Sequence, residues 1–282
     1  MNISTIILFH ENSDMEIISC LTSVEIAANQ VSLEMNLILG FTSSEPSQKI
    51  KNYLKNRKVD YLLFGKNVFH SYGINELVKL SQAKYCFILN PDVVVAPDLF
   101  KEFVKLETRL DSKTAAVECR QLPFDHPKIY DEKSKEVTWF SGACVFIRRK
   151  AFKLVDGFDF SIFPMYCNDV DISLRLRNLG FKLYFEPELR VFHSKQIDEN
   201  GKIFRSQFEK VESENSYLLM HVKYHQLNYP IQTRLYQKLA QGLDRDFITR
   251  LKLIRNRKKF KVSKELISEF FVKGDFSQRR FK

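Results

Sequence analysis

Short apolar runs alternate with amphipathic segments over roughly the first 110 residues. Four runs have the length and composition of buried strands, and they are Ile3–Phe9, Leu37–Leu39, Tyr61–Phe64 and Tyr85–Leu89. Helical patterns lie between or after them, over a segment that ends at Ala28 and over Gln48–Leu54, Asn75–Leu80 and Lys101–Leu110. The first helix opens at Ser13-x-x-Glu16, the spacing of a capping box. This alternation predicts an α/β fold with a mostly parallel central sheet and helices on both faces.

The pattern changes in the second half of the chain. A long β-rich run covers Val137–Arg148, and a helix is expected over Asp169–Leu179, with Gly180 just beyond its end. Two more strands are expected at Phe181–Phe185 and Arg190–Phe192. The α/β domain is therefore assigned to residues 1–203. A helical C-terminal region is assigned to residues 204–282, and its best helix candidates are Tyr217–Tyr224 and Asp246–Phe260.

The basic charge of the chain belongs to its C-terminal part. The net charge is +10, yet residues 1–230 hold 29 Lys and Arg against 29 Asp and Glu, whereas residues 231–282 hold 15 against 5. Phe247, Leu251 and Ile254 fall on one face of the predicted last helix. Such a basic amphipathic tail fits an anionic membrane surface, or a helix packed on its own domain. Nucleic acid fits less well, because base-stacking aromatics are not interleaved with the basic residues.

Composition and cysteine usage indicate a globular protein in a reducing compartment. Hydrophobic residues make up 44% of the chain and aromatic residues 13%, which is ample material for a core. The five cysteines form no C-x-x-C pair, and most lie in apolar runs, so we expect buried thiols. The N-terminus lacks the basic region of a signal peptide, and apolar stretches stay below the roughly 18 residues of a spanning helix. We expect a cytoplasmic protein, with peripheral attachment to the inner face of the membrane as the alternative.

Candidate chemistry follows the fourth predicted strand. Asn90-Pro91-Asp92 comes directly after Phe87-Ile88-Leu89, at the sheet edge where α/β proteins bind ligands. A carboxylate there suits a hard divalent cation such as Mg²⁺ or Mn²⁺. Asn, Pro and Asp are also ordinary turn residues, so a plain turn is the alternative.

Two further groups are each open to two interpretations. Asn168-Asp169-Val170-Asp171 starts a helix, where an acid can cap the first turn or point into a cleft. His193 follows a strand and is either a packed histidine or a ligand.

The order of these groups resembles family 2 glycosyltransferases of the GT-A fold, particularly the rhamnosyltransferase-like branch. In that family a strand ends in N-x-D or D-x-D, followed by W-x-SGA-x-x-x-x-R, GGFD, EDVDL-x-x-R and V-x-H. The corresponding stretches here run colinearly and are Phe87–Asp92, Trp139–Arg148, Asp156–Asp159, Asn168–Arg175 and Val191–His193. Asn67, Gly73 and Asn75 match the spacing of a further family element, N-x-G-F-x-x-G-x-N.

The resemblance implies metal-dependent, inverting sugar transfer from a nucleotide-diphosphate donor to a glycan or lipid-linked acceptor in surface polysaccharide synthesis. It implies that Asp92 and His193 bind the divalent cation and that Asp169 is the general base. The resemblance also implies that the donor is contacted by Asn67, Asn75, Asn90 and Asp92. It implies that the acceptor is contacted by Trp139, Gly142 and Asp171, and that Asp171 also orients the helix start. A homo-oligomer is left open.

This chain departs from the family pattern at four places. The usual D-N-x-S after the second strand reads Gly40-Phe41-Thr42-Ser43, and the glycine after Asn67 is replaced around Val68-Phe69. Asn168 occupies the position of the family's Glu. The basic pair that often begins the family's last core helix is replaced by Glu214-Asn215-Ser216-Tyr217. These losses leave a second hypothesis, a catalytically silent domain that binds a partner or a glycan. A sugar nucleotidyltransferase is disfavoured, because Phe9-His10-Glu11-Asn12 is no glycine-rich phosphate loop.

Overall fold

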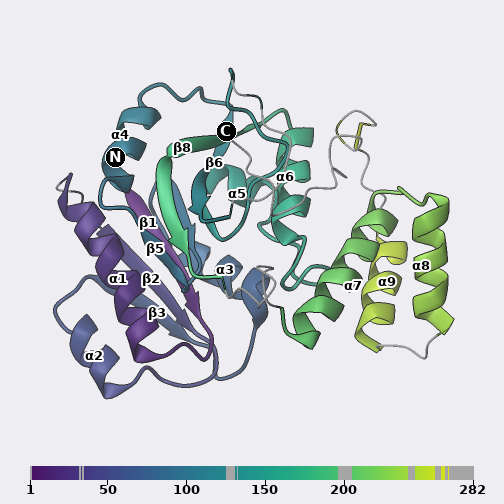
Figure 1. Ribbon diagram of the computed structural model, residues 1–282, viewed down its shortest axis with the longest axis horizontal. Coiled ribbons are helices and arrows are strands. Elements are labelled where there is room, and N and C mark those ends of the chain that lie inside the picture. The colour runs from purple at the N-terminus through teal and green to yellow at the C-terminus, as the bar shows by residue number, and fades with distance from the viewer. Residues whose placement is uncertain are drawn as a thin grey trace.

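The computed structural model describes residues 2–31, 33, 35–124, 131, 133–195, 205–240, 245–257, 262–263 and 266. Its centre is an eight-stranded sheet of order β3-β2-β1-β4-β7-β6-β8-β5 (Figure 1). The strands are β1 Ile3–Phe9, β2 Met35–Phe41, β3 Val59–Leu63, β4 Tyr85–Leu89, β5 Val93–Val95, β6 Thr114–Leu122, β7 Cys144–Arg148 and β8 Lys182–His193.

The α/β class is confirmed, and the sheet is mixed. Strands β1 to β4 pair in parallel, as the alternating pattern predicts, and β6 pairs in parallel with β8. Strand β7 is antiparallel to both β4 and β6, and β5 is antiparallel to β8. The carboxyl ends of β1, β2, β3 and β4 therefore meet at one edge, which the turn before β7 and the end of β8 approach from the other half of the sheet.

Helices cover both faces of the sheet, as predicted. Helices α1 (Asp14–Asn29), α2 (Gln48–Leu54) and α4 (Leu99–Glu107) contribute buried residues to one apolar cluster. Helices α3 (Phe69–Leu80), α5 (Arg149–Leu154) and α6 (Asn168–Asn178) contribute to a second cluster on the opposite face. The capping box of Ser13 and Glu16 is present at the start of α1, and Gly180 takes a left-handed conformation just after α6.

Several sequence-based boundaries are wrong, and some elements were not predicted. The expected β run over Val137–Arg148 divides, because Val137 bonds to β8, residues 138–143 form a loop, and the strand β7 begins at Cys144. The two strands expected after Gly180 are one strand, β8. Strand β6 was not predicted, since its sequence includes the buried acid Glu118 and does not alternate.

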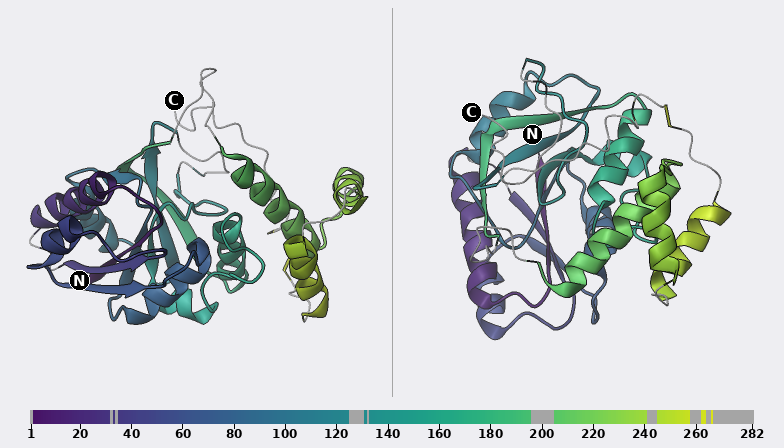
Figure 2. Two further views of the ribbon diagram at one scale, coloured as in Figure 1. Left: turned by 90° about the horizontal axis from the view of Figure 1, so that it is seen from below. Right: turned by 45° about the vertical axis from the view of Figure 1, so that its right-hand side comes forward.

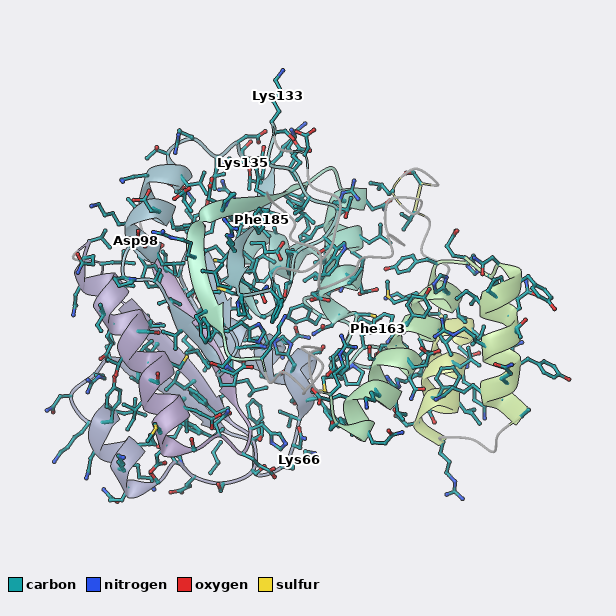
Figure 3. The ribbon with its side chains drawn as sticks, in the orientation of Figure 1. Lys66, Asp98, Lys133, Lys135, Phe163 and Phe185 are labelled. Atoms are coloured by element: carbon teal, nitrogen blue, oxygen red, sulfur yellow. The ribbon has the colours of Figure 1, made fainter. Side chains whose placement is uncertain are left out.

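The described C-terminal helices form a group beside the α/β part, with α7 next to α6 and α8 outermost (Figures 1 and 2). They are α7 (Gln207–Lys223), α8 (Tyr229–Ala240) and α9 (Arg245–Asn256), and they share a third apolar cluster with Ile162, Phe163 and Leu174 of the α/β part. Phe163 lies at this junction (Figure 3). The domain boundary at residue 203 stays a prediction.

The apolar face of α9 covers the protein's own core. Phe247 is fully buried, and Leu251 and Ile254 pack against the third cluster. Of the two interpretations of the basic tail, the structure supports a helix packed on its own domain over residues 245–256. Residues 258–260 of the basic run lie outside the described residues. Within the described ranges, we find no helix that combines the length and the hydropathy needed to cross a bilayer.

The cysteine thiols are free, and four of the five, all except Cys167, are buried. Burial raises the pKa of the Cys20 thiol to about 12 and that of Cys86 to about 11. The buried cysteines therefore act as small apolar groups of the core, as the sequence predicts.

Candidate active site

Asn90 and Asp92 occupy the turn that joins β4 to β5. The backbone N–H of Asn90 donates to the carbonyl of Ala143 at 2.8 Å, and the N–H of Val93 donates to the carbonyl of Asn90 at 3.3 Å. The motif is therefore a turn, as one interpretation held. The same turn leaves the Asp92 side chain about one third exposed at the carboxyl edge of the sheet.

The structure brings together the two residues predicted to bind a cation. Asp92 Oδ2 lies 3.1 Å from Nε2 of the buried His193, although 101 positions separate them in the chain. The pairing of β5 with β8 sets this distance, because Val93 lies opposite His193 in the register. On the other side of the imidazole, Nδ1 lies 2.8 Å from Oε1 of Gln121.

The donor set of this pair suits a divalent cation. Mg²⁺ takes ligands at about 2.1 Å in octahedral geometry, so two adjacent ligands lie about 3 Å apart, close to the observed separation of Asp92 and His193. Among the residues that the structure describes, no group of three His, Cys, Asp or Glu side chains could hold a metal. The two side chains therefore fit a cation that takes its other ligands from phosphate and water, the common arrangement for magnesium at diphosphates.

Asp169 stands in the first turn of α6, facing the loop before β7. Its Oδ2 accepts the backbone N–H of Gly142 at 3.0 Å, and its Oδ1 accepts the N–H of Val170 at 2.8 Å. A Cβ atom at position 142 would lie 3.6 Å from Cβ of Asp169, so the two segments approach closely. Both carboxylate oxygens are thus held in place, and the N-terminus of the helix favours their ionised form.

A neutral histidine that sequence reasoning missed lies beside this carboxylate. Nδ2 of Asn168 donates to Nδ1 of His70 at 3.0 Å and to Oγ of Ser71 at 2.9 Å. Burial lowers the pKa of His70 to about 4, so its Nδ1 can accept this bond at neutral pH. The amide at position 168, where the family has Glu, therefore ties α6 to α3.

Asp171 joins the start of α6 to α7. Its carboxylate is fully buried, and it accepts from Nε of Arg175 at 2.8 Å and from the Tyr224 hydroxyl at 2.7 Å. Lys223 of α7 bonds the same carboxylate. The acceptor contact of Asp171 and its role in orienting the helix start both stay predictions.

Asn75 bonds the backbone of Phe158, and its predicted contact with the donor stays a prediction. Its Nδ2 donates to the carbonyl of Phe158 at 2.8 Å, and its Oδ1 accepts the N–H of Phe158 at 2.9 Å. The preceding Gly157 has φ +66°, and a Cβ atom there would lie 2.4 Å from Oδ1 of Asn75. This clamp explains the glycine of the Asp156-Gly157-Phe158-Asp159 motif.

The predicted nucleotide edge carries a hydrogen-bonded array of His10, Thr42 and Asn67, and the acid that the family has after the second strand is missing here. His10, directly after β1, lies with Nδ1 2.7 Å from Oγ1 of Thr42 and with Nε2 3.1 Å from Nδ2 of Asn67. Sequence reasoning missed His10, although its position after the first strand was a usable signal. Phe69, at the place of the family glycine, retains a left-handed backbone with φ 55°.

Trp139 and the large cavity complete the surroundings. Trp139 is half-buried in the loop that leads to Gly142, and its acceptor contact stays a prediction.

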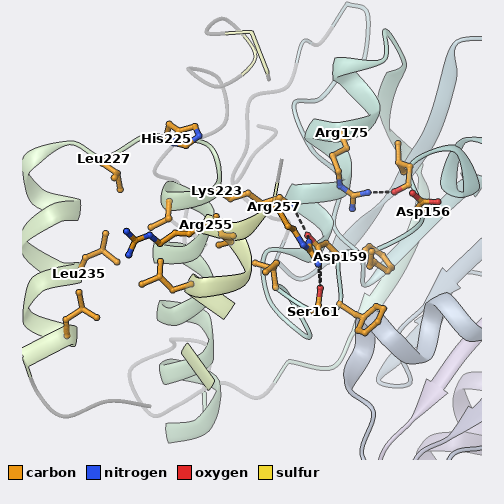
Figure 4. Close-up of a pocket in the computed structure, with 18 residues that line it drawn as sticks. Asp156, Asp159, Ser161, Arg175, Lys223, His225, Leu227, Leu235, Arg255 and Arg257 are labelled. Atoms are coloured by element: carbon orange, nitrogen blue, oxygen red, sulfur yellow. Dashed lines mark hydrogen bonds and ion pairs between the residues drawn. The ribbon is translucent and has the colours of Figure 1, made fainter. Parts of the chain in front are cut away.

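A cavity of about 910 Å³ lies between α7–α9 and residues 155–162 (Figure 4). In it, Arg257 donates to Asp159 at 2.7 Å. Neither Asp92 nor Asp169 lines this cavity, so the chemistry that we assign does not depend on it.

Comparison with curated proteins finds partial relatives, and no family model matches the chain. The chain is 40% identical over 65 residues to an N-acetylglucosaminyl-diphospho-decaprenol L-rhamnosyltransferase of Mycobacterium tuberculosis, covering 23% of this chain and 21% of that protein. It is 36% identical over 72 residues to the rhamnosyltransferase WbbL of Escherichia coli, covering 26% of each. The matches thus span about a quarter of the length of these relatives or less.

Solved structures share the fold over most of the chain. GalNAc-T7 with UDP, GalNAc and Mn²⁺ matches with a TM-score of 0.61 and 14% identity, over 79% of this chain and 48% of that one. The mannosyltransferase PcManGT of Pyrobaculum calidifontis with GDP-Man and Mn²⁺ gives 0.56 and 11%, over 90% and 84%. TarS of S. aureus, residues 1–349, gives 0.53 and 11%, over 68% and 60%. These matches show that the chain has the GT-A fold of the solved glycosyltransferases, and that about a quarter of it is similar in sequence to rhamnosyltransferases.

Proposed function

We propose that the chain is an inverting glycosyltransferase that moves a sugar from a nucleotide-diphosphate donor to a glycan or lipid-linked saccharide. The observation that carries this proposal is the pairing of Asp92 with His193 at the carboxyl edge of the sheet. The partial relatives are rhamnosyltransferases, and one is named for a diphospho-decaprenol acceptor, which supports a deoxyhexose donor and a lipid-linked acceptor.

Asp92 and His193 are the residues that would hold the divalent cation of this reaction. A bound cation supplies positive charge that stabilises the departing nucleoside diphosphate. We assign the donor contacts to Asn90, in the same turn, and to Asn67, whose side chain bonds His10. The two solved structures that contain Mn²⁺ support the same choice of cation.

Asp169 takes the proton of the attacking acceptor hydroxyl in this proposal. Its Oδ2 accepts the N–H of Gly142 and its Oδ1 accepts the N–H of Val170, and a carboxylate oxygen is the group that would accept the substrate proton. Because the carboxylate is held from two sides, it cannot rotate away when the proton is transferred. Attack on the anomeric carbon, on the face opposite the leaving diphosphate, then inverts the configuration of the sugar.

The array of His10, Thr42 and Asn67 bears on the donor. The family has an acid after the second strand, whereas this chain offers an imidazole, a hydroxyl and an amide at the neighbouring strand ends. This chemistry favours recognition of a nucleoside without a carboxylate contact to the ribose. The proposal also includes association with an anionic membrane surface and a homo-oligomeric state.

Thermal unfolding with a panel of UDP-, dTDP- and GDP-sugars, with and without Mn²⁺, tests the proposal. Binding to the native state raises the melting temperature, so one nucleotide class should give a shift that requires the metal. Sugar transfer to a short-chain N-acetylglucosaminyl-diphospho-prenol should then be measured for that donor. The change Asp169→Asn should lower the transfer rate about 10²- to 10⁴-fold and retain the metal-dependent shift.

The outcomes separate the two hypotheses. Equal transfer by wild type and the Asp169→Asn variant would rule out Asp169 as the base. A panel without any shift, combined with no transfer, would replace the enzyme by the catalytically silent domain that binds a partner or a glycan.

A further inference from the structure

Gln121 and His193 are neighbours on one face of the sheet. The register of β6 and β8 places Gln121 opposite Val191, so the side chain of His193 lies diagonally across from it. Both side chains are buried, with 1% and 6% exposed, and Oε1 of Gln121 lies 2.8 Å from Nδ1 of His193. We propose that Gln121 is a positioning residue that fixes the tautomer and the orientation of His193 for the divalent cation. This inference rests on the proposed function.

The hydrogen bond assigns the proton of the imidazole. An amide oxygen only accepts, so Nδ1 of His193 must carry the hydrogen, and in the neutral ring Nε2 then presents its lone pair. That lone pair faces Oδ2 of Asp92 at 3.1 Å. Two acceptors at this distance repel each other unless a proton or a cation lies between them. The tautomer that Gln121 selects is therefore the one that a cation beside Asp92 requires.

Metal-binding histidines commonly donate their second ring N–H to an oxygen, which orients the ring and raises the affinity for the metal. In many sites that oxygen belongs to a carboxylate. Gln121 supplies a neutral oxygen instead, so it fixes the ring without adding a second buried negative charge, which would need a compensating cation of its own. The row Gln121, His193, Asp92 is built from three segments, namely the end of β6, the end of β8 and the turn before β5.

Titration of Mn²⁺ measured by electron paramagnetic resonance, in the presence of saturating UDP or dTDP, tests the effect on affinity. Gln121→Leu, which removes the acceptor, should weaken Mn²⁺ binding about 10- to 100-fold. Gln121→Asn keeps an amide but is one methylene too short to reach Nδ1, and it should weaken binding similarly. Gln121→Glu retains the oxygen and should bind Mn²⁺ within a few-fold of wild type.

A matched control is Ser81→Ala. It removes a buried hydrogen bond, the 2.8 Å contact of Ser81 with Ser4, at the opposite end of the sheet. It should leave Mn²⁺ affinity unchanged, which separates a local effect at His193 from a general loss of stability.

Nitrogen-15 NMR of histidine-labelled protein, without metal, reads the tautomer directly. At about pH 8, the His193 resonance should show the Nδ1–H form in wild type and shift toward the Nε2–H form in Gln121→Leu and Gln121→Asn. His193→Gln identifies the resonance by its absence. A residue that only stabilised the fold would not move this equilibrium.

Each result has a distinct meaning. If wild type binds Mn²⁺ and both Gln121→Leu and Gln121→Asn bind it equally well with an unchanged tautomer, the inference about Gln121 is wrong while the cation site stands. If wild type binds no Mn²⁺ with either nucleotide, the cation assignment of the proposed function fails, and the role of Gln121 toward a cation fails with it.

Discussion

Replacing Lys223 with Met removes the ammonium group that joins α7 to the α/β part of the protein. Lys223 Nζ lies 2.9 Å from Oδ2 of Asp159, and it also bonds Asp171 at the start of α6. The side chains involved are nearly or fully buried. Met retains the length and the apolar stem of Lys, so the change isolates the charge.

The structure sets the size of the expected loss. Removing one partner of a buried ion pair costs about 3 to 5 kcal/mol, because the remaining charge stays buried without compensation. Here Asp171 keeps Arg175, and Asp159 keeps Arg257. We therefore expect the lower end, a decrease of about 3 kcal/mol in the free energy of unfolding.

The same change should alter acid stability. Burial alone would raise the pKa of Asp159, but Lys223 and Arg257 outweigh it and lower this pKa to about 2. Burial also opposes ionisation of Asp171, and Lys223 with Arg175 lowers the pKa of that carboxyl below its ordinary value. Because the native pKa values lie below that of an unfolded Asp, about 3.9, this stabilisation is complete above pH 4 or so and is lost as the pH falls toward about 2. Without Lys223, acid unfolding should begin at a higher pH.

Urea unfolding followed by circular dichroism, at neutral pH and along an acid series, gives both quantities. Arg234→Met is the matched control, because the ion pair of Arg234 with Glu214 is exposed and should contribute less than about 1 kcal/mol. A loss in Lys223→Met no larger than in the control, or an acid transition at the wild-type pH, would refute this reasoning.

Two further changes address the backbone. Phe69→Gly should be more stable than Phe69→Ala by about 1 kcal/mol, because φ is 55° at this position and only glycine adopts this angle without strain. Chemical unfolding of the two variants measures the difference, and equal stability would contradict the prediction. Gly157→Ala should lose more stability than Gly180→Ala. Both glycines have positive φ, but a Cβ at position 157 would meet Asn75 Oδ1 at 2.4 Å whereas position 180 is open, so similar melting temperatures would count against the clamp.

Local sequence patterns determined much of the fold and placed the main chemical groups. Strands β1 and β4 and helix α2 follow from their apolar periodicity, and the capping box fixed the start of α1. Asp92 and Asp169 could be placed at the end of a strand and the start of a helix, because both positions are set by neighbours within a few residues.

Other features of the candidate site depend on contacts between distant segments. The distance from Asp92 to His193 comes from the pairing of β5 with β8. The contact of Gln121 with His193 comes from the pairing of β6 with β8, and β6 was not predicted because it includes the buried acid Glu118. His10 meets Thr42 and Asn67 through the order of three parallel strands.

Burial also decided between interpretations that the sequence left open. Periodicity shows that α9 has an apolar face, but only the packing of Phe247 into the third cluster shows that the protein itself covers it. In the same way, a carboxylate at position 171 was visible in the sequence, whereas its ion pairs with Arg175 and Lys223 are not. Periodicity depends on the nearest turns of the chain, while burial and pairing depend on segments that meet only after folding, so the sequence determined the elements and the tertiary structure determined their partners.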